Sequence, residues 1–175
     1  VLLASNAWTG LIHPYFDGAI VGMRGQMFAT APCPQRLLPA PVYADFGFEY
    51  FRQLPDGRIL AGGGRRASLD TELTYVDPRT DKVQGAIESF LYSCFPAARG
   101  LAVAHRWAGI MGFSCDELPN IGPVPGSVNV YAAAGYHGHG LGYAIIPGKA
   151  VSEMMLDGRT SVPCEVFSPR RHQQG

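Results

Sequence analysis

The stretch that most restricts the fold of this chain runs from residue 131 to residue 143, Tyr-Ala-Ala-Ala-Gly-Tyr-His-Gly-His-Gly-Leu-Gly-Tyr. The apolar run Val128–Ala134 predicts a buried strand, and Tyr143–Leu156 predicts a helix that Asp157-Gly158 stops. Between them, the glycines allow positive φ angles and leave no Cβ in the way of a ligand. A strand, a glycine turn and a helix N-terminus together form a site for an anionic or electron-rich group, because free N–H groups and the helix dipole point at it.

Two alternatives stay open for this stretch. A tight strand-to-helix turn that binds nothing explains the glycines equally well, because glycine spacing alone is a weak signal. His137 and His139 would suit a metal ion, but residues two apart do not share a helix face, and no cysteine or carboxylate stands beside them. We therefore expect packed or hydrogen-bonded histidines, and no metal site.

The composition indicates a globular chain. Of 175 residues, 47% are hydrophobic and 16% are charged, and the net charge of zero excludes the basic surface of a nucleic-acid-binding protein. No apolar run reaches the ~18 residues of a membrane span. The apolar segment Val1–Ala4 predicts a buried strand that needs neighbouring strands to cover it. We therefore expect this chain to be the later part of a longer protein. The cysteines form no CxxC pair and predict reduced thiols in a cytoplasmic protein: Cys33, Cys94, Cys115 and Cys164.

Strands and one long helix make up most of the remaining pattern. A Pro55-Asp56-Gly57 turn predicts a hairpin between strands Val42–Leu54 and Arg58–Gly62. Asp77-Pro78 predicts the start of a helix with an apolar face that ends at Phe95-Pro96. Further strands are predicted at Ala19–Thr30, with a kink near residues 22–25, and at Leu101–Phe113, followed by a loop over Ser114–Gly126 and a frayed polar tail over residues 161–175.

Three segments in this order carry a resemblance: Tyr50–Gly63, Arg106–Pro123 with its Arg-Trp-Ala-Gly-Ile start, and Ala134–Gly140 with its Gly-His-Gly end. They resemble the C-terminal half of the FAD-dependent enzymes of the glycine oxidase, sarcosine oxidase and D-amino acid oxidase family. Members of this family move a hydride from the carbon beside an amine to flavin N5, which needs no protein nucleophile or metal. The family's N-terminal Gly-x-Gly-x-x-Gly turn is absent from this sequence, so we expect the chain alone to be inactive.

The resemblance also implies a division of the chain. Residues 1–15 would end an FAD-binding domain, residues 16–108 would form a substrate domain with a helix near 78–95, residues 109–160 would return to the FAD-binding domain, and residues 161–175 would form a tail. The expected fold class is α+β, and α/β in the full-length protein, with an antiparallel or mixed substrate-domain sheet, flanking helices and the C-terminal part of an FAD/NAD(P)-binding fold. The residues expected to contact FAD are Trp8, Gly109, Ile110, Met111, Gly135, Tyr136, His137, Gly138, His139, Gly140 and Leu141.

Some positions depart from the family pattern. Relatives similar to glycine oxidase place carboxylate-binding arginines where Met111 and Gly138 stand, and some sarcosine-oxidase-like relatives place a lysine at Gly142. A carboxylate clamp needs a guanidinium fork, so we expect an amine whose carboxylate is distant, absent or held by the missing half. Relatives with covalent flavin carry a cysteine near Gly109, so non-covalent FAD is expected here.

The resemblance gives Tyr50, Arg52 and Met111 as substrate-facing residues. An aromatic packed within the sheet explains Tyr50 equally well, and a solvated strand charge explains Arg52. A different class of function also stays open, namely a catalytically silent fragment or subunit that acts as an interaction domain. The expected partners are a small-molecule amine or amino acid, and the missing N-terminal half or a partner subunit.

Overall fold

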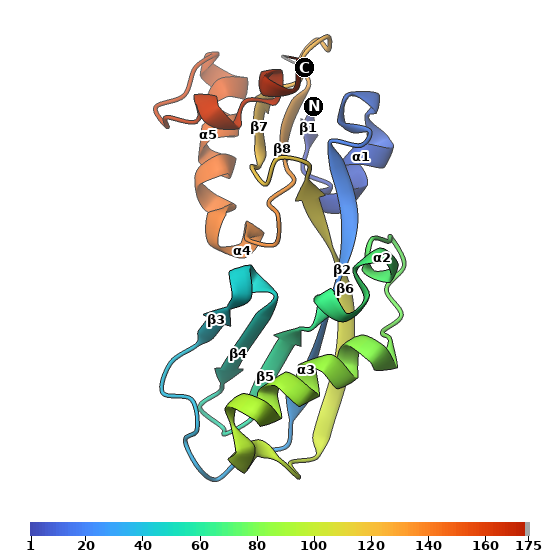
Figure 1. The fold of residues 1–175 in the computed structure, drawn as a ribbon. Helices are drawn as coiled ribbons and strands as arrows, with labels where there is room; N and C mark the ends of the chain where they lie inside the picture. Colours follow the sequence, from blue (N-terminus) through green and yellow to red (C-terminus); the bar gives the residue numbers. More distant parts are fainter. Residues whose placement is uncertain (174–175) are drawn as a thin grey trace. The chain divides into compact units, whose positions relative to one another are not determined.

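The structure is a computed structural model that describes residues 1–173 (Figure 1). The chain divides into two compact units, the first made of Val1–Met23 with Met111–Gly175 and the second made of Arg24–Ile110. Strands β2 (Ile20–Thr30) and β6 (Val103–Ser114) contain the boundaries and contribute residues to both units. The mixed helices and sheets confirm the α+β class, whereas the roles of the units as FAD-binding and substrate domains stay a prediction.

The first unit is built on a three-stranded sheet of order β1-β8-β7, in which β1 is parallel and β7 antiparallel to β8. Its elements are β1 (Leu2–Leu3), η1 (Asn6–Trp8), α1 (Thr9–Ile12), η2 (Pro14–Phe16), β7 (Asn120–Pro123), β8 (Tyr131–Ala134), α4 (Gly140–Tyr143), α5 (Ile145–Asp157), η6 (Glu165–Phe167) and η7 (Pro169–Gln173), where η denotes a 3-10 helix.

Strand β8 is buried on both faces. Ala132 and Ala134 belong to a core cluster with Phe16, whereas Ala133 belongs to a second cluster with Val151 of α5. A strand covered on both sides needs a continuous apolar run rather than an alternating one, which is why the predicted strand has that composition. Helix α5 ends at Gly158 in a left-handed conformation, as Asp157-Gly158 predicted.

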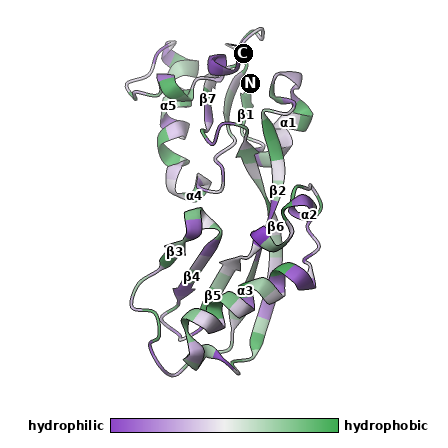
Figure 2. Ribbon diagram, viewed as in Figure 1, coloured by the Kyte–Doolittle hydropathy of each residue, from purple (hydrophilic) through white to green (hydrophobic). Residues whose placement is uncertain are grey.

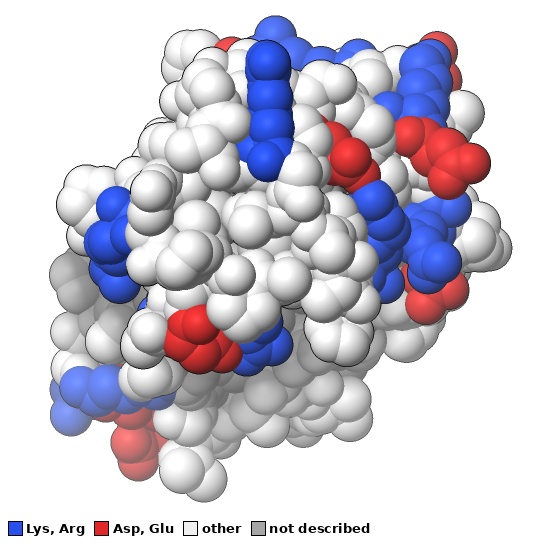
Figure 3. All heavy atoms as spheres, turned by 90° about the horizontal axis from the view of Figure 1, so that it is seen from below, with Lys and Arg blue, Asp and Glu red and all other residues white. Residues whose placement is uncertain are grey.

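The second unit contains a sheet of order β3-β4-β5-β2-β6, and α3 packs against β4 and β5. The predicted turn at residues 55–57 joins β4 to β5, with Gln53 opposite Ile59. Figure 2 shows hydrophobic and hydrophilic residues mixed along α3. Figure 3, which views the protein from below, shows basic and acidic side chains interspersed on that surface. The other elements are β3 (Val42–Ala44), η3 (Asp45–Gly47), β4 (Glu49–Gln53), β5 (Ile59–Gly63), η4 (Arg65–Ser68), α2 (Leu69–Glu72), α3 (Asp81–Cys94) and η5 (Pro96–Ala98).

Two predicted element boundaries in the second unit are wrong. The single strand predicted over Val42–Leu54 is two paired strands, because the 3-10 turn between them holds Asp45 and Phe46 at φ 51° and 53°. The helix predicted to start at Asp77-Pro78 starts at Asp81. The side chain of Gln26 binds both the backbone N–H and the hydroxyl of Thr80, so a tertiary contact fixes the helix entry instead of the local aspartate.

Four further corrections concern the first unit and β2. The loop predicted over Ser114–Gly126 contains β7, and β2 is one unbroken strand despite its glycines. The strand at the start of the chain exists, but Val1 and Leu2 are exposed rather than buried. The tail is not frayed as far as residue 173, because η6 and η7 fold onto the unit and Cys164 is buried.

The described residues contain no disulfide, and all four cysteines are free thiols, as predicted. None of the helices in residues 1–173 has the length and apolar character that crossing a bilayer requires.

Candidate functional site

Gly112 of β6 connects the beginning of the chain to the glycine turn. Its N–H donates to Oδ1 of Asn6 over 2.8 Å, and its carbonyl accepts from the N–H of His137 over 3.0 Å. A Cβ at this position would stand 3.0 Å from the backbone nitrogen of Ala7, so η1 lies directly on Gly112. The sequence analysis missed Gly112 and Asn6. A glycine inside a strand often marks a close backbone approach, which is the signal that could have found it.

The glycines of the turn fall into two kinds. Gly135 and Gly138 have φ of 74° and 85°, values that a residue with a side chain rarely adopts, as predicted. Gly140 and Gly142 lie in α4 and have no positive φ, so the expectation is wrong for these two. A Cβ at Gly140 would instead come to 3.4 Å from the side chain of Tyr136.

The turn leaves backbone donors available. The N–H groups of His139 and Gly142 donate within the turn, to Tyr136 and His139 respectively. In the part of the chain that the structure describes, no carbonyl accepts from the N–H groups of Gly138, Gly140 or Leu141. These donors lie where the chain enters α4, so they suit an electron-rich ligand atom.

The two histidines of the turn are packed and hydrogen-bonded, as expected. The His137 ring lies against Phe113 with ring centres 4.1 Å apart, and its backbone has a φ of 51°. Nδ1 of His139 donates to the carbonyl of His137 over 2.9 Å, and its ring stacks on Tyr143. Both rings therefore support the shape of the turn.

Met111 and Gly138 lie next to each other in the first unit. Sδ of Met111 and the Phe113 ring each stand 3.8 Å from the point where a Cβ of Gly138 would be. The two positions that the resemblance gives for carboxylate-binding arginines thus form one apolar patch, with no charge on either side chain. Phe113 is a further member of this patch that sequence analysis missed.

The remaining residues expected to contact FAD are divided between the units. Trp8 lies in η1 of the first unit and is 42% exposed. Gly109 and Ile110 precede Met111 in β6 and belong to the second unit. A Cβ at Gly109 would meet nothing within 4 Å, so the backbone there is open.

Tyr50 of the second unit lies across β5. A Cβ added to Gly62, its partner in the neighbouring strand, would stand 2.2 Å from Cε2 of Tyr50. The ring therefore occupies the space that the missing side chain leaves, and burial raises the pKa of its phenol. The ring is packed on the sheet and half-buried, and the substrate-facing role of Tyr50 stays a prediction. Arg52, on the same face of β4, is exposed.

Arg65 is a buried cation near Tyr50 that sequence analysis missed. It is 8% exposed, donates to the carbonyl of Gly47 and lies 4.3 Å from the centre of the Phe48 ring. Burial lowers its pKa, and the interactions with Tyr50 and Glu49 oppose that shift. The Gly-Gly-Gly-Arg-Arg sequence reads as a surface connection, so only the tertiary structure reveals the buried guanidinium.

Residues 1–154 match the family described as DAO, FAD dependent oxidoreductase. The chain belongs to this family. The match confirms the resemblance to glycine oxidase and its relatives, and an FAD-dependent oxidoreductase family implies flavin use. In this member of the DAO family, the turn at residues 135–142 combines two features that the sequence indicated. Gly135 and Gly138 adopt positive φ, and some backbone N–H groups donate to no carbonyl of the described chain.

Known proteins of similar sequence or fold cover almost the whole chain. Gamma-glutamylputrescine oxidoreductase of Escherichia coli is 27% identical over 163 residues, which are 89% of this chain and 36% of that protein. Glycine oxidase of Pseudomonas aeruginosa is 29% identical over 171 residues, 97% of this chain and 45% of that protein. The crystal structure of L-proline dehydrogenase from P. horikoshii has a TM-score of 0.83 and 27% identity, covering 100% of this chain and 47% of that one. The chain thus spans less than half of each.

The residues of the turn fit the flavin end of FAD. Side chains at Gly135 and Gly138 would need a strained backbone, and the N–H groups of Gly138, Gly140 and Leu141 donate to no carbonyl of the described chain. These groups would face the part of a flavin that gains negative charge on reduction, which backbone dipoles stabilise. The adenosine end requires a glycine motif that this sequence does not contain.

Proposed function

We propose that this chain forms the flavin-ring and substrate-facing part of an FAD-dependent oxidoreductase that oxidises the C–N bond of an amine or amino acid. The observation that carries the proposal is the glycine turn of a DAO-family chain, with unused N–H groups at the entry to α4. Bound FAD would supply the hydride acceptor at flavin N5. The chain would supply orientation, exclusion of water and a fixed set of dipoles.

In this proposal the flavin contacts come from the turn, from Trp8 and from the Gly109–Met111 segment. Tyr50, Arg52 and Met111 would face the substrate, Tyr50 through an aromatic wall and Met111 through an adaptable apolar contact. FAD would be non-covalent, because relatives with covalent flavin carry a cysteine near Gly109, and neither Gly109 nor its neighbours Ala108 and Ile110 are cysteines. The four free thiols support a cytoplasmic location as part of the same proposal.

The preferred substrate would be an amine without an α-carboxylate. Met111 and Gly138 form an apolar patch where similar amino-acid oxidases place cations, so a substrate carboxylate there would lose its charge-assisted hydrogen bonds. One relative is named for γ-glutamylputrescine, whereas others are named for glycine and L-proline, so the family as a whole leaves both classes open. Arg65 is the cation of the second unit that would hold a carboxylate if the preference were reversed.

The test is a comparison of matched substrates by the complete enzyme, including its dinucleotide-binding part. Under anaerobic conditions, each amine and its α-carboxylated analogue are mixed with enzyme, and loss of the oxidised flavin absorbance gives kcat/KM. We expect the amine to exceed its analogue by about tenfold or more, because a lost contact to a buried carboxylate costs about 2–5 kcal/mol. A consistent advantage for the carboxylated member contradicts the substrate preference, and no flavin reduction by any amine contradicts the function.

A second candidate function is an interaction domain without catalytic activity. The exposed apolar side chains of the first unit favour it, because Leu141 and Ile145 are 100% and 83% exposed. The same amine panel separates the two functions, since a silent domain would bind its partner without reducing flavin. Flavin reduction by one amine is enough to decide for the enzyme.

A further inference from the structure

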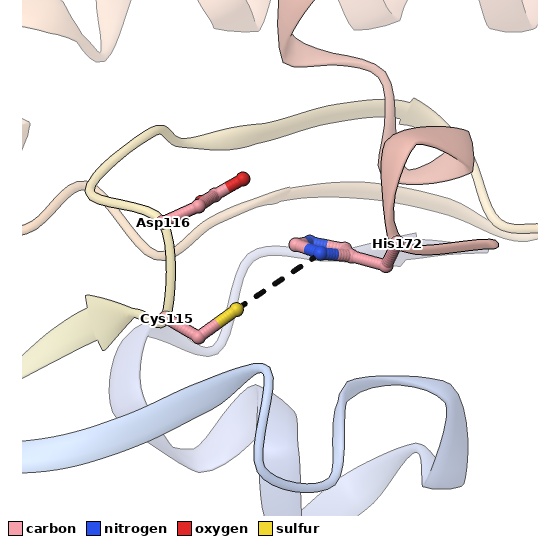
Figure 4. Close-up of side chains that lie close together, drawn as sticks. All are labelled: Cys115, Asp116 and His172. Carbon is pink, nitrogen blue, oxygen red and sulfur yellow. Dashed lines mark hydrogen bonds between the residues drawn. The ribbon is translucent and has the colours of Figure 1, made fainter. Parts of the chain in front are cut away.

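Three side chains with metal-ligating atoms, none of which the proposed function uses, converge in the first unit. Cys115 and Asp116 form the turn that follows β6, and His172 comes from η7 at the other end of the unit's sequence. The thiol sulfur, a carboxylate oxygen and an imidazole nitrogen all lie within 4.8 Å of one another. Figure 4 shows the three side chains pointing toward a common space. The geometry points to a binding site for a divalent metal ion of the zinc type.

The histidine is held in the form that a metal ion needs. Nε2 of His172 lies 2.9 Å from Oδ1 of Asn120, a fully buried side chain of β7. Because an amide oxygen only accepts, Nε2 carries the proton and the lone pair of Nδ1 is left for the ion. That lone pair faces Cys115, whose Sγ is 4.0 Å from Nδ1. A histidine whose second nitrogen is fixed by a hydrogen bond is the usual arrangement behind a metal ligand.

Asp116 keeps a lone pair for a metal ion, although both of its carboxylate oxygens already accept hydrogen bonds. Arg171 donates to both oxygens of Asp116, and the N–H of Leu118 donates to Oδ1. A carboxylate offers about four lone-pair positions, so Oδ2 keeps one of them. Metal-bound carboxylates are commonly hydrogen-bonded in this way, because the second contact orients the ligand. Arg171 therefore positions Asp116 and does not replace the ion.

The distances require only a small adjustment. Zinc bonds of about 2.0–2.3 Å in a tetrahedron place donor atoms about 3.3–3.8 Å apart. The three donors are within 4.8 Å, so rotamer adjustments of about 1 Å close the site. Cys115 and Asp116 are exposed, which gives the ion an entry path, and water completes the fourth position.

The donor set selects the kind of ion. Thiolate and imidazole ligands suit zinc and neighbouring transition metals, whereas calcium and magnesium require oxygen ligands. Binding would release the thiol proton and form the sulfur–metal bond without any change in oxidation state. An occupied site would tie η7 to the turn after β6, in addition to the hydrogen bonds that Arg171 donates to Asp116.

The test uses the purified chain of residues 1–175, stripped of metal with a chelator. Zinc uptake is measured by competition with a chromophoric indicator, for the wild type and for Cys115→Ser and His172→Gln. Cys94→Ser and His105→Gln are the matched controls, since both residues are exposed and belong to the second unit. We expect one equivalent of zinc, at least about tenfold weaker binding in each site variant, and unchanged binding in both controls.

Cobalt substitution provides a readout that does not depend on the variants. Cobalt bound by Cys115 gives a thiolate-to-metal charge-transfer band in the near ultraviolet, which the wild type must show even where a variant folds poorly. Equal zinc uptake by wild type and both site variants, or cobalt binding without this band, overturns the proposal. Rapid alkylation of Cys115 relative to Cys94 without metal uptake also overturns it, and identifies the Cys115–His172 pair as a reactive thiol instead.

Discussion

Replacing Glu49 by glutamine should change the free energy of unfolding in favour of the variant more at pH 8 than at pH 5. Glu49 is 8% exposed on the face of β4 that carries Phe51, and its Oε2 accepts no hydrogen bond from the described chain. Burial raises the pKa of this carboxyl from 4.5 to about 7, and Asp45 adds to the shift. The hydrogen bond from the N–H of Gly64 opposes it, as do the charges of Arg65 and Arg66.

The sign and size of the effect follow from that shift. The folded state holds the proton more tightly than the unfolded state, so the free energy of unfolding is highest below pH 4.5. It falls as the pH rises from 4.5 to about 7 and is level above. At about 1.4 kcal/mol per pH unit, ionisation of Glu49 costs up to about 3 kcal/mol at pH 8. Glutamine removes this cost because it is never ionised, while its oxygen still accepts from Gly64.

Urea unfolding followed by circular dichroism at pH 5 and pH 8 measures the difference. The free energy of unfolding of Glu49→Gln minus that of the wild type should be up to about 3 kcal/mol higher at pH 8 than at pH 5. An amide without a hydrogen-bond partner in the variant would change the free energy of unfolding by the same amount at both pH values. This change cancels when the two pH values are compared. Glu117→Gln, at an exposed position, is the control and should show no such dependence. The same difference at both pH values refutes the argument that Glu49 keeps its proton when folded.

Three further predictions concern the glycines and the cofactor. In the complete enzyme, Gly138→Val should lower the flavin content, because a φ of 85° costs a branched residue about 1–2 kcal/mol or more. Gly142→Ala is the control and should retain the flavin. Equal absorbance of the two variants at the flavin maximum would contradict this prediction. Gly62→Ala should displace the Tyr50 ring, which lowers the free energy of unfolding by about 1–3 kcal/mol and with it the melting temperature. Gly85→Ala, on an open helix surface, is the control and should not lower it. An unshifted melting temperature of Gly62→Ala would refute the contact. The 175-residue chain alone should bind FAD weakly, and a stoichiometrically yellow preparation would disprove it.

Local patterns predicted the elements whose determinants are near in sequence. The hairpin at residues 55–57, the continuous apolar strand β8 and the stop at Gly158 depend on turn conformations and burial that a few neighbouring residues decide. The glycine turn was found for the same reason, since closely spaced glycines permit the positive φ that Gly135 and Gly138 adopt. The family resemblance supplied the rest of the candidate site, including Met111.

Contacts between distant residues explain what the sequence could not supply. The entry of α3 is fixed by Gln26, which lies 54 residues before Thr80. The tail is ordered because Arg171 binds Asp116, 55 residues away, and no local pattern in a polar segment indicates such a partner. Arg65 is buried by the fold of η3 and β4 around it, and its place after three glycines in the sequence does not indicate this burial.

The position of Gly112 restricts how β6 can vary in length. Both of its contacts, to Asn6 and to His137, use backbone atoms of the strand. Neighbouring side chains in β6 can therefore be exchanged while these contacts persist, but one inserted or deleted residue would bring a bulky neighbour, Met111 or Phe113, against η1. Natural variants of this strand should accordingly differ by substitution and conserve its residue count, with length changes confined to the loops at its ends.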